Sequence, residues 1–253
     1  MNNVALITGA ASGLGGATAA HLASHGWTIV GVDLNEEKGE AHFATLEGEG
    51  HRFVVADVTD EAAMQGAIDI ATSLGSLRAS IACAGVAWAS RMVKRDGSAH
   101  PLDLFSKVIQ INLIGTFNVA RLASAAMCNN EPDEHGQRGV LIHTASVAAF
   151  EGQIGQVAYS ASKGGVAGMC LPIARDLASR GVRCLTIAPG IFMTPMVAGM
   201  PDKVQESLAA SIPNPSRLGK AEEYAKLAKF MIETPYLNGE TIRLDGAVRL
   251  APR

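Results

Sequence analysis

Short apolar runs alternate with segments of helical length and periodicity from one end of this 253-residue chain to the other. The apolar runs are hydrophobic on both faces, which is typical of parallel strands that helices cover on either side. Parallel strands need crossover connections, so the alternation indicates repeated strand–helix–strand units. It predicts an α/β fold with a doubly wound parallel sheet of about seven strands and helices on both faces.

We expect strands at the apolar runs, residues 4–8, 28–32, 52–56, 80–82, 140–144, 183–188 and 241–244. We expect helices over the periodic segments between them, residues 13–25, 36–47, 61–73, 102–127, 157–180 and 220–232. Three polar or proline-rich stretches interrupt this order, residues 91–101, 129–139 and 189–215. Long connections in compact domains are usually lids or binding loops, so we expect 189–215 to bind substrate. No linker divides the chain, and we expect a single domain over residues 1–253.

Composition argues against several classes of function. The net charge is −3, so no basic field is available for a nucleic-acid backbone or an anionic membrane surface. The four cysteines lie far apart without a CxxC pair, which argues against a disulfide framework and a thiolate metal site. The uncharged stretch before Asp33 is rich in small residues and lacks the positive n-region of a secretory signal. We therefore expect a cytoplasmic protein without metal, nucleic-acid or membrane partners.

The first expected strand runs into a glycine-rich segment, TGAASGLG, in which a helix opens. Gly9, Gly13 and Gly15 permit a tight turn there, and a helix N-terminus favours the negative charge of a pyrophosphate. Ser12 and Leu14 lie in the same segment and are further candidates for cofactor contacts. The spacing is Gly-x3-Gly-x-Gly, which differs from the usual Gly-x-Gly-x-x-Gly, so a plain glycine-rich turn remains the alternative.

Asp33 ends the second expected strand, about 20 residues beyond the glycines. A carboxylate there hydrogen-bonds the adenosine ribose hydroxyls and repels a 2′-phosphate, which predicts NAD rather than NADP. Asp57 and Val58 follow the third expected strand and are candidates for contacts near the adenine. For both aspartates, capping of the following helix is the structural alternative.

Tyr159 and Lys163 are four residues apart on an expected helix, so their side chains project from one face, and Ser146 ends a strand 13 residues before Tyr159. A phenol titrates near pH 10 and is a poor base at neutral pH until a positive charge stabilises the phenolate. We expect Lys163 and an oxidised nicotinamide ring to supply that charge.

Together these features resemble the short-chain dehydrogenase/reductase family along essentially the whole chain, which implies a Rossmann fold. The matching motifs are TGAASGLG, INLIGTFN with Asn112, Ser146, YSASK, PGIFMTP and LNGETIRLDGA. A finer likeness is to the type II 3-hydroxyacyl-CoA dehydrogenases, also called type 10 17β-hydroxysteroid dehydrogenases. It is carried by CAG at 83–85, NNEPDEHGQRG at 129–139, TASVAAFEGQIGQVAYSASKGG, LPIARDLA and NPSRLG.

The resemblance implies a role for each matching residue. Tyr159 is expected to be the general acid and base, Ser146 to hydrogen-bond the substrate oxygen, and Lys163 to hold the nicotinamide ribose. Asn112 is expected to position a water that links Lys163 to bulk solvent. Further cofactor contacts are expected from Cys83, Ala84, Gly85, Pro189, Gly190 and Thr194, the last at the nicotinamide carboxamide. Substrate contacts are expected from Phe192 and Gln153, with a solvent-facing loop amide as the alternative for Gln153.

Two residues depart from the expected pattern. Cys83 stands where most of the family has asparagine, so a contact near the cofactor is lost or replaced. His143 stands where close relatives are expected to carry asparagine. We expect His143 to be a core histidine whose hydrogen bonds are satisfied, because its strand position can point away from the site.

The implied activity is the NAD-dependent interconversion of a secondary alcohol and a ketone, with 3-hydroxyacyl-CoA esters as the expected substrates. A hydroxysteroid or aryl-alkyl alcohol dehydrogenase is the first alternative, and a catalytically silent cofactor-binding scaffold is the alternative of another class. Two sets of residues bear on the substrate: the apolar side chains of Phe192, Met193, Met196, Val197, Met200 and Leu208, and the cations Arg91, Lys94 and Arg95. The apolar set suits an acyl chain or sterol, or packs as a lid on its own core. The cations could meet coenzyme A phosphates or form a solvated face.

We also expect self-association. The segments 102–127 and 157–180 carry many small residues, which allow partner helices to approach closely. The resemblance implies a homotetramer with two-fold interfaces. Residues 250–253 could reach a neighbouring subunit.

Overall fold

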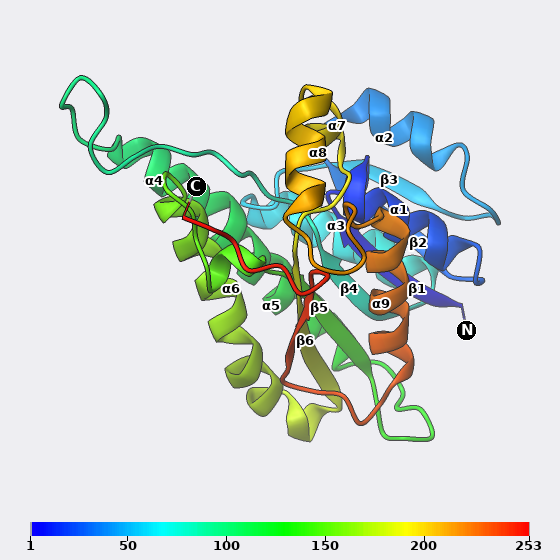
Figure 1. Cartoon of the computed structure of the whole chain (residues 1–253). Coiled ribbons are helices and arrows are strands. Elements are labelled where there is room, and N and C mark those ends of the chain that lie inside the picture. The colour runs from blue at the N-terminus through cyan, green and yellow to red at the C-terminus, as the bar shows by residue number, and fades with distance from the viewer. Residues whose placement is uncertain (1, 253) are drawn as a thin grey trace.

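One sheet of seven parallel strands forms the centre of the molecule (Figure 1), in the order β3-β2-β1-β4-β5-β6-β7. The computed structural model describes residues 2–252, and only the backbone of Met196. The strands are β1 (Asn3–Thr8), β2 (Thr28–Asp33), β3 (Arg52–Val55), β4 (Ser76–Ala82), β5 (Gly139–Thr144), β6 (Val182–Pro189) and β7 (Thr241–Leu244). The strand order reverses between β1 and β4, which confirms the predicted doubly wound α/β fold.

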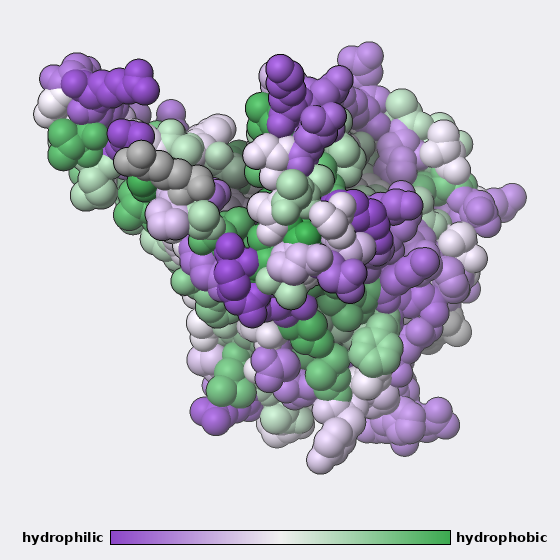
Figure 2. Space-filling model, viewed as in Figure 1, coloured by the Kyte–Doolittle hydropathy of each residue, from purple (hydrophilic) through white to green (hydrophobic). Residues whose placement is uncertain are grey.

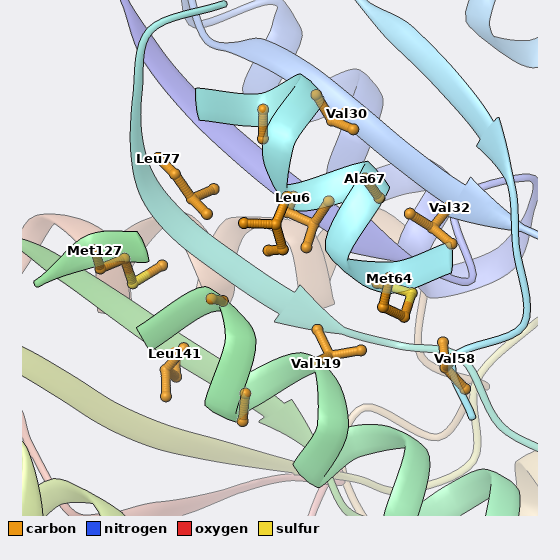
Figure 3. Close-up of a cluster of buried hydrophobic side chains, with 14 of the residues drawn as sticks. Leu6, Val30, Val32, Val58, Met64, Ala67, Leu77, Val119, Met127 and Leu141 are labelled. Carbon is orange, nitrogen blue, oxygen red and sulfur yellow. The ribbon is translucent and has the colours of Figure 1, made fainter. Parts of the chain in front are cut away.

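Helices cover both faces of the sheet and bury a separate apolar layer on each. The helices are α1 (Gly13–Ala23), α2 (Glu36–Phe43), α3 (Glu61–Leu74), α4 (Leu102–Ile109), α5 (Gly115–Met127), α6 (Val157–Asp176), α7 (Pro195–Ala198), α8 (Asp202–Ala210) and α9 (Ala221–Glu233). On one face, α3 and α5 pack Met64 and Val119 against Leu6 and Leu141 (Figure 3). On the other face, α1 and α9 pack Leu22 and other side chains against β1 and β4. No helix within residues 2–252 is long and apolar enough to cross a membrane.

The predicted helix over 102–127 is wrong in one respect, because a π-helical turn, Gln110–Ile114, separates α4 from α5. A π turn inserts one residue into the helix and is common at functional sites. Asn112 lies in this turn and is fully buried. Hydrophobic periodicity does not reveal a single inserted residue, so the sequence predicted one continuous helix.

The irregular segments lie at the ends of the strands. The 189–215 connection folds into α7 and α8, which stand above the carboxyl ends of the strands in Figure 1. The 91–101 insert forms a narrow arm closed by one antiparallel bridge between Val93 and Ala99. This arm projects away from the body of the molecule, and its tip is hydrophilic in Figure 2.

Candidate active site

A cleft of about 630 Å³ opens at the carboxyl ends of the strands, where the strand order reverses. Such switch points are where open α/β sheets bind ligands. The structure brings together there the residues whose cofactor or substrate contacts the motifs predict: Gly9, Ser12, Gly13, Leu14, Gly15, Asp33, Asp57, Val58, Cys83, Ala84, Gly85, Ser146, Gln153, Tyr159, Lys163, Pro189, Gly190, Phe192 and Thr194. Asn112 is the expected site residue that does not line the cleft. Sequence reasoning missed Val86, Ile191 and Leu250 among the lining residues.

The glycine-rich loop forms one end of the cleft from backbone alone. Gly9 and Gly13 have φ values of +68° and +58°, which side chains rarely allow. A Cβ on Gly15 would lie 2.3 Å from the carbonyl oxygen of Gly9. α1 opens at Gly13, its N-cap Ser12 makes no side-chain capping bond, and no acidic residue lies in its first turn. The first amide groups of α1 are therefore free for an anion, which fits a dinucleotide pyrophosphate.

Asp33 lies beside this loop at the end of β2. Its carboxylate accepts hydrogen bonds from the backbone nitrogens of Ala11 and Asn35, both at 3.1 Å. The capping alternative is wrong for Asp33, because Asn35 caps α2 by accepting from Lys38 N. The carboxylate is instead held at the edge of the cleft, where a ribose would lie.

Asp57 also lines the cleft rather than capping a helix. Its Oδ1 accepts hydrogen bonds from the backbone nitrogen and hydroxyl of Thr59, both at 2.8 Å. Asp60 caps α3 by accepting from Ala63 N, so the capping alternative fails here too.

Ser146, Tyr159 and Lys163 converge on the middle of the cleft. Ser146 follows β5, and its hydroxyl accepts from Ala148 N at the start of a short 3-10 turn. Tyr159 and Lys163 share one face of α6, and Lys163 Nζ lies 5.9 Å from the centroid of the Tyr159 ring. The ammonium donates to the carbonyl of Thr144 at 2.7 Å. The hydroxyl, phenol and ammonium groups are thus placed to hydrogen-bond one substrate oxygen and to transfer one proton to or from it.

Burial governs the acidities of this group. It raises the pKa of Tyr159, and a hydrogen bond from Ser146 acts in the opposite direction. Burial also lowers the pKa of Lys163 to about 8. The lowering of the phenol pKa that we expected from Lys163 is not found in the protein itself, because desolvation disfavours the phenolate more strongly. Tyr159 therefore holds its proton at neutral pH.

Asn112 acts behind the cleft. Its Oδ1 accepts from Val86 N at 2.8 Å, and its Nδ2 donates to Val86 O at 2.9 Å and to Ser162 Oγ at 3.0 Å. Both amide hydrogens are used by the protein, so this residue would hold the expected water only as a hydrogen-bond acceptor. Asn112 ties the segment after β4 to α6, the helix that carries Lys163, and is a positioning residue.

A buried hydrogen-bond network lies behind Lys163. It includes Tyr224, a residue that the sequence did not indicate. Tyr224 on α9 places its hydroxyl 2.7 Å from Thr144 Oγ1 and 3.6 Å from Cys83 Sγ. The carbonyl of the same threonine receives Lys163. The thiol of Cys83 thus contacts the hydroxyl groups of Tyr224 and Thr144, at the position where most of the family is expected to carry asparagine. The only signal for Tyr224 was a polar tip on an otherwise apolar helix face, which is also typical of core tyrosines.

His143 lies on β5 and does not line the cleft. Burial lowers its pKa to about 4. The prediction of a core histidine is confirmed, but the prediction that its hydrogen bonds are satisfied is wrong. Nδ1 lies 3.9 Å from Cys184 Sγ, and Nε2 has no partner within residues 2–252. Burial desolvates the ring, so it is held neutral.

The remaining candidates divide between the cleft and the surface. Phe192, Val197 and Leu208 line the cleft, while Val197 and Leu208 also pack on an apolar cluster of their own, so the binding and packing alternatives both hold in part. Met193 is exposed, and the side chain of Met196 lies outside the described residues. The three cations of the 91–101 arm, Arg91, Lys94 and Arg95, are exposed and do not line the cleft. The described residues contain no group of three or more His, Cys, Asp or Glu side chains that could hold a metal.

Gln153 and the end of the chain lie together. Gln153 Nε2 donates to the carbonyl of Ala251 at 3.0 Å, so it is not a free loop amide. Ile154 N donates to the carbonyl of Pro252 at 3.1 Å. Residues 251 and 252 therefore contact the loop after β5 of the same chain, and Arg253 lies outside the described residues.

Comparisons with known proteins cover the same residues. The family model for short chain dehydrogenases matches residues 3–205. A Bos taurus protein named 3-hydroxyacyl-CoA dehydrogenase type-2 is 55% identical over 251 residues, which cover 98% of this chain and 96% of that protein. An Ips pini protein named ipsdienol dehydrogenase is 35% identical over 252 residues, covering 98% and 97%. The crystal structure of 3-hydroxyacyl-CoA dehydrogenase type-2 from Mycobacterium avium is 44% identical and superposes with a TM-score of 0.95, covering 100% of this chain and 98% of that one.

Proposed function

The chain belongs to the short-chain dehydrogenase family, and we propose that it is an NAD-dependent dehydrogenase of 3-hydroxyacyl-CoA esters. The observation that carries this proposal is the convergence of Ser146, Tyr159 and Lys163 in one cleft with the glycine-rich loop. The similarity of the whole chain to proteins named 3-hydroxyacyl-CoA dehydrogenase type-2, at 51% to 55% identity, supports the choice of substrate class.

The residues of the cleft fit a nicotinamide dinucleotide. The open first turn of α1 suits its pyrophosphate, and the Asp33 carboxylate suits a ribose with free hydroxyls. Leu34, which also lines the cleft, offers no positive charge for a 2′-phosphate, and this supports NAD over NADP. The bound cofactor supplies the hydride donor or acceptor at its nicotinamide ring.

The protein's own residues position the substrate and move the proton. Ser146 and Tyr159 would hydrogen-bond the substrate oxygen. When a ketone is reduced, Tyr159 donates its proton to that oxygen, and its raised pKa keeps it protonated beforehand. When an alcohol is oxidised, Tyr159 must start as the phenolate and accepts the hydroxyl proton of the alcohol, and nearby positive charge is needed to stabilise that phenolate. Lys163, held by Thr144, supplies part of that charge.

Apolar side chains at the substrate end of the cleft, from Phe192, Val197, Leu208 and Leu250, suit an acyl chain. One observation favours the alternative of a simpler secondary alcohol. The cations Arg91, Lys94 and Arg95 lie outside the cleft lining, so none of them marks a phosphate site beside it. The relative named ipsdienol dehydrogenase supports the same alternative at lower identity.

A spectrophotometric assay of NADH oxidation tests the proposal. The wild-type protein should reduce acetoacetyl-CoA faster than simple aryl or sterol ketones, and faster with NADH than with NADPH. Tyr159→Phe should lose about 10²- to 10⁴-fold in turnover while still binding NADH, because only the proton donor is removed. Tyr236→Phe, which alters a fully exposed tyrosine, is the matched control. Near-normal turnover by Tyr159→Phe would end the assignment.

We also propose a homotetramer. Large apolar side chains are exposed on the outer helices, with Leu102, Phe117 and Leu171 on α4, α5 and α6 and Phe230 on α9. Exposed apolar patches of this kind mark interfaces between proteins. Light scattering in solution measures the assembly, and a monomeric mass would contradict this proposal.

A further inference from the structure

The last residues of the chain turn back over the substrate end of the cleft. After β7 the backbone reverses at Asp245, with φ values of 58° at Gly246 and 66° at Ala247. A positive φ is uncommon for alanine, so surrounding contacts must hold this turn. Residues 248–252 then run toward the loop after β5, shown in red in Figure 1, and Leu250 lines the cleft. We call residues 245–252 the C-terminal tail.

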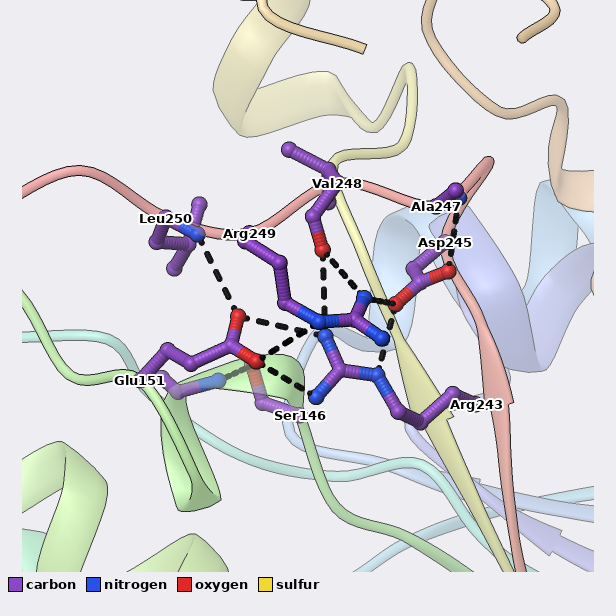
Figure 4. Close-up of polar contacts among 9 residues, drawn as sticks. Ser146, Glu151, Arg243, Asp245, Ala247, Val248, Arg249 and Leu250 are labelled. Atoms are coloured by element: carbon purple, nitrogen blue, oxygen red, sulfur yellow. Dashed lines mark hydrogen bonds and ion pairs between the residues drawn. The ribbon is translucent and has the colours of Figure 1, made fainter. Parts of the chain in front are cut away.

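Glu151 fastens the start of this tail (Figure 4). Its carboxylate receives both terminal nitrogens of Arg243, at 2.8 and 3.2 Å, and the backbone nitrogen of Leu250 at 3.2 Å. Arg243 in turn binds Asp245 at 2.7 Å and donates to the carbonyl of Val248 at 3.1 Å. The pair is partly shielded, with side-chain exposures of 22% for Glu151 and 24% for Arg243. A two-pronged, shielded pair of this kind fixes orientation as well as distance.

A second arginine and two backbone contacts extend the attachment. Arg249 Nε lies 3.2 Å from Glu151 Oε1, and its NH1 lies 3.3 Å from Asp245 Oδ2. Gln153 and Ile154 then bind the carbonyls of Ala251 and Pro252. Residues 151–154 of the loop after β5 are thus tied to the tail.

Apolar contacts also join the tail to the 189–215 connection, which we call the substrate loop. Val248 is buried in one cluster with Ile212 and Leu218, and Leu250 packs against the same cluster beside Leu208. Val248 and Leu250 of the tail therefore form part of the apolar cluster on which the substrate loop packs. A change in the tail should move that wall of the cleft.

We propose that the C-terminal tail is a wall of the substrate cleft and that Leu250 determines specificity for the apolar part of the substrate. Glu151 and Arg243 are positioning residues that hold this wall. The inference about acyl chains rests on the proposed function. Leu250 is the tail residue that faces the cleft, and the network around Glu151 holds its backbone nitrogen directly.

Three variants test the wall, with acetoacetyl-CoA and 3-ketooctanoyl-CoA as paired substrates. Leu250→Ala opens space, so the ratio of kcat/KM for the long over the short substrate should rise about tenfold. Glu151→Gln should raise KM for both acyl substrates by about tenfold with little change in kcat or in KM for NADH, because it loosens the wall and not the proton donor. A chain ending at Val248 should repeat this KM pattern. Glu223→Gln is the matched control, because it breaks a two-pronged pair with Arg217 outside the cleft.

The outcomes separate the two proposals. An unchanged chain-length ratio in Leu250→Ala, with acyl-CoA turnover intact, overturns the role of the tail. A fall in kcat without a rise in KM for Glu151→Gln overturns it too, because that pattern reports a disturbed Ser146. If the wild-type protein reduces no acyl-CoA, the proposed function fails, and a pair of short and long methyl ketones then measures the same ratio. Melting temperatures of every variant verify that each one is folded.

Discussion

The two sides of the cleft are built by different means. Around the glycine-rich loop, the cofactor side consists of backbone and small residues that are close in the sequence, and a side chain on Gly15 would clash with the backbone of Gly9. The substrate side consists of side chains from three distant segments, 146–163, 189–215 and 245–252, joined by ion pairs and apolar contacts. The first side tolerates almost no change in shape. The second can change its shape through side chains while the cofactor site stays intact, which suits a fold used for many substrates.

The largest expected effect is on the cofactor side. In Gly15→Ala the new Cβ would lie 2.3 Å from the carbonyl oxygen and 2.8 Å from the carbonyl carbon of Gly9. Backbone cannot move aside as a side chain does, so we expect a loss of about 3 kcal/mol or more in the free energy of unfolding. We also expect NADH affinity to fall by at least about 100-fold, because the pyrophosphate site would shift. Denaturant unfolding and NADH titration measure the two effects.

The matched control for this variant is Gly66→Ala. Gly66 lies on the exposed side of α3, and a Cβ there meets nothing within 4 Å. Alanine should stabilise that helix by up to about 1 kcal/mol. Unchanged stability and NADH affinity in Gly15→Ala would show that the loop is not fixed by its backbone.

The same contrast explains what the sequence could predict. The parallel strands, the glycine-rich loop and the position of Asp33 follow from local patterns, such as apolar runs, glycines and one acidic residue after a strand. Helical spacing places Tyr159 and Lys163 on one face, and their roles follow from the family resemblance. These predictions need no knowledge of how distant segments pack, and the structure brings the predicted residues into one cleft.

The rest depends on contacts between distant segments. Glu151 lies 92 residues before Arg243, and nothing in either local sequence indicates their pairing. Tyr224 reaches Thr144 across 80 residues. The π turn at Asn112 adds one residue to a helix without altering its apolar pattern. The lack of a partner for His143 Nε2 depends on how β5 packs against its neighbours, which the local sequence does not indicate.

An intermediate effect on stability is expected at His143, which lies on β5 and does not line the cleft. Its pKa is about 4 in the folded protein and 6.5 in its ordinary state, so the unfolded chain binds the extra proton first as pH falls. Above pH 6.5 the histidine is neutral in both the folded and the unfolded chain, so its lowered pKa does not change the free energy of unfolding. Between pH 6.5 and about 4 only the unfolded chain binds the proton, and stability is lost progressively. Between about pH 7.5 and about pH 5 the loss is roughly 2 kcal/mol.

His143→Asn removes this titration and should lose roughly 2 kcal/mol less than the wild type over that range. Denaturant unfolding at the two pH values measures the difference. His135→Asn changes an exposed histidine and should follow the wild type. Identical acid sensitivity in wild type and His143→Asn would mean that the ring is not held neutral by burial.

The smallest effect is expected from the same glycine-to-alanine change on the substrate side. A Cβ on Gly219 would lie 2.9 Å from ring atoms of Phe192, which lines the cleft. The contact is with a side chain rather than backbone, so the ring can shift, and the free energy of unfolding should fall by no more than about 1 kcal/mol. Moving the ring should change KM for the ketone by about threefold and leave KM for NADH unchanged, because the nearest atoms to the new Cβ all belong to the Phe192 ring and none to the glycine-rich loop. Steady-state kinetics with each substrate varied in turn separate the two constants. If Gly219→Ala weakens NADH as much as Gly15→Ala does, the two sides of the cleft are coupled rather than independent.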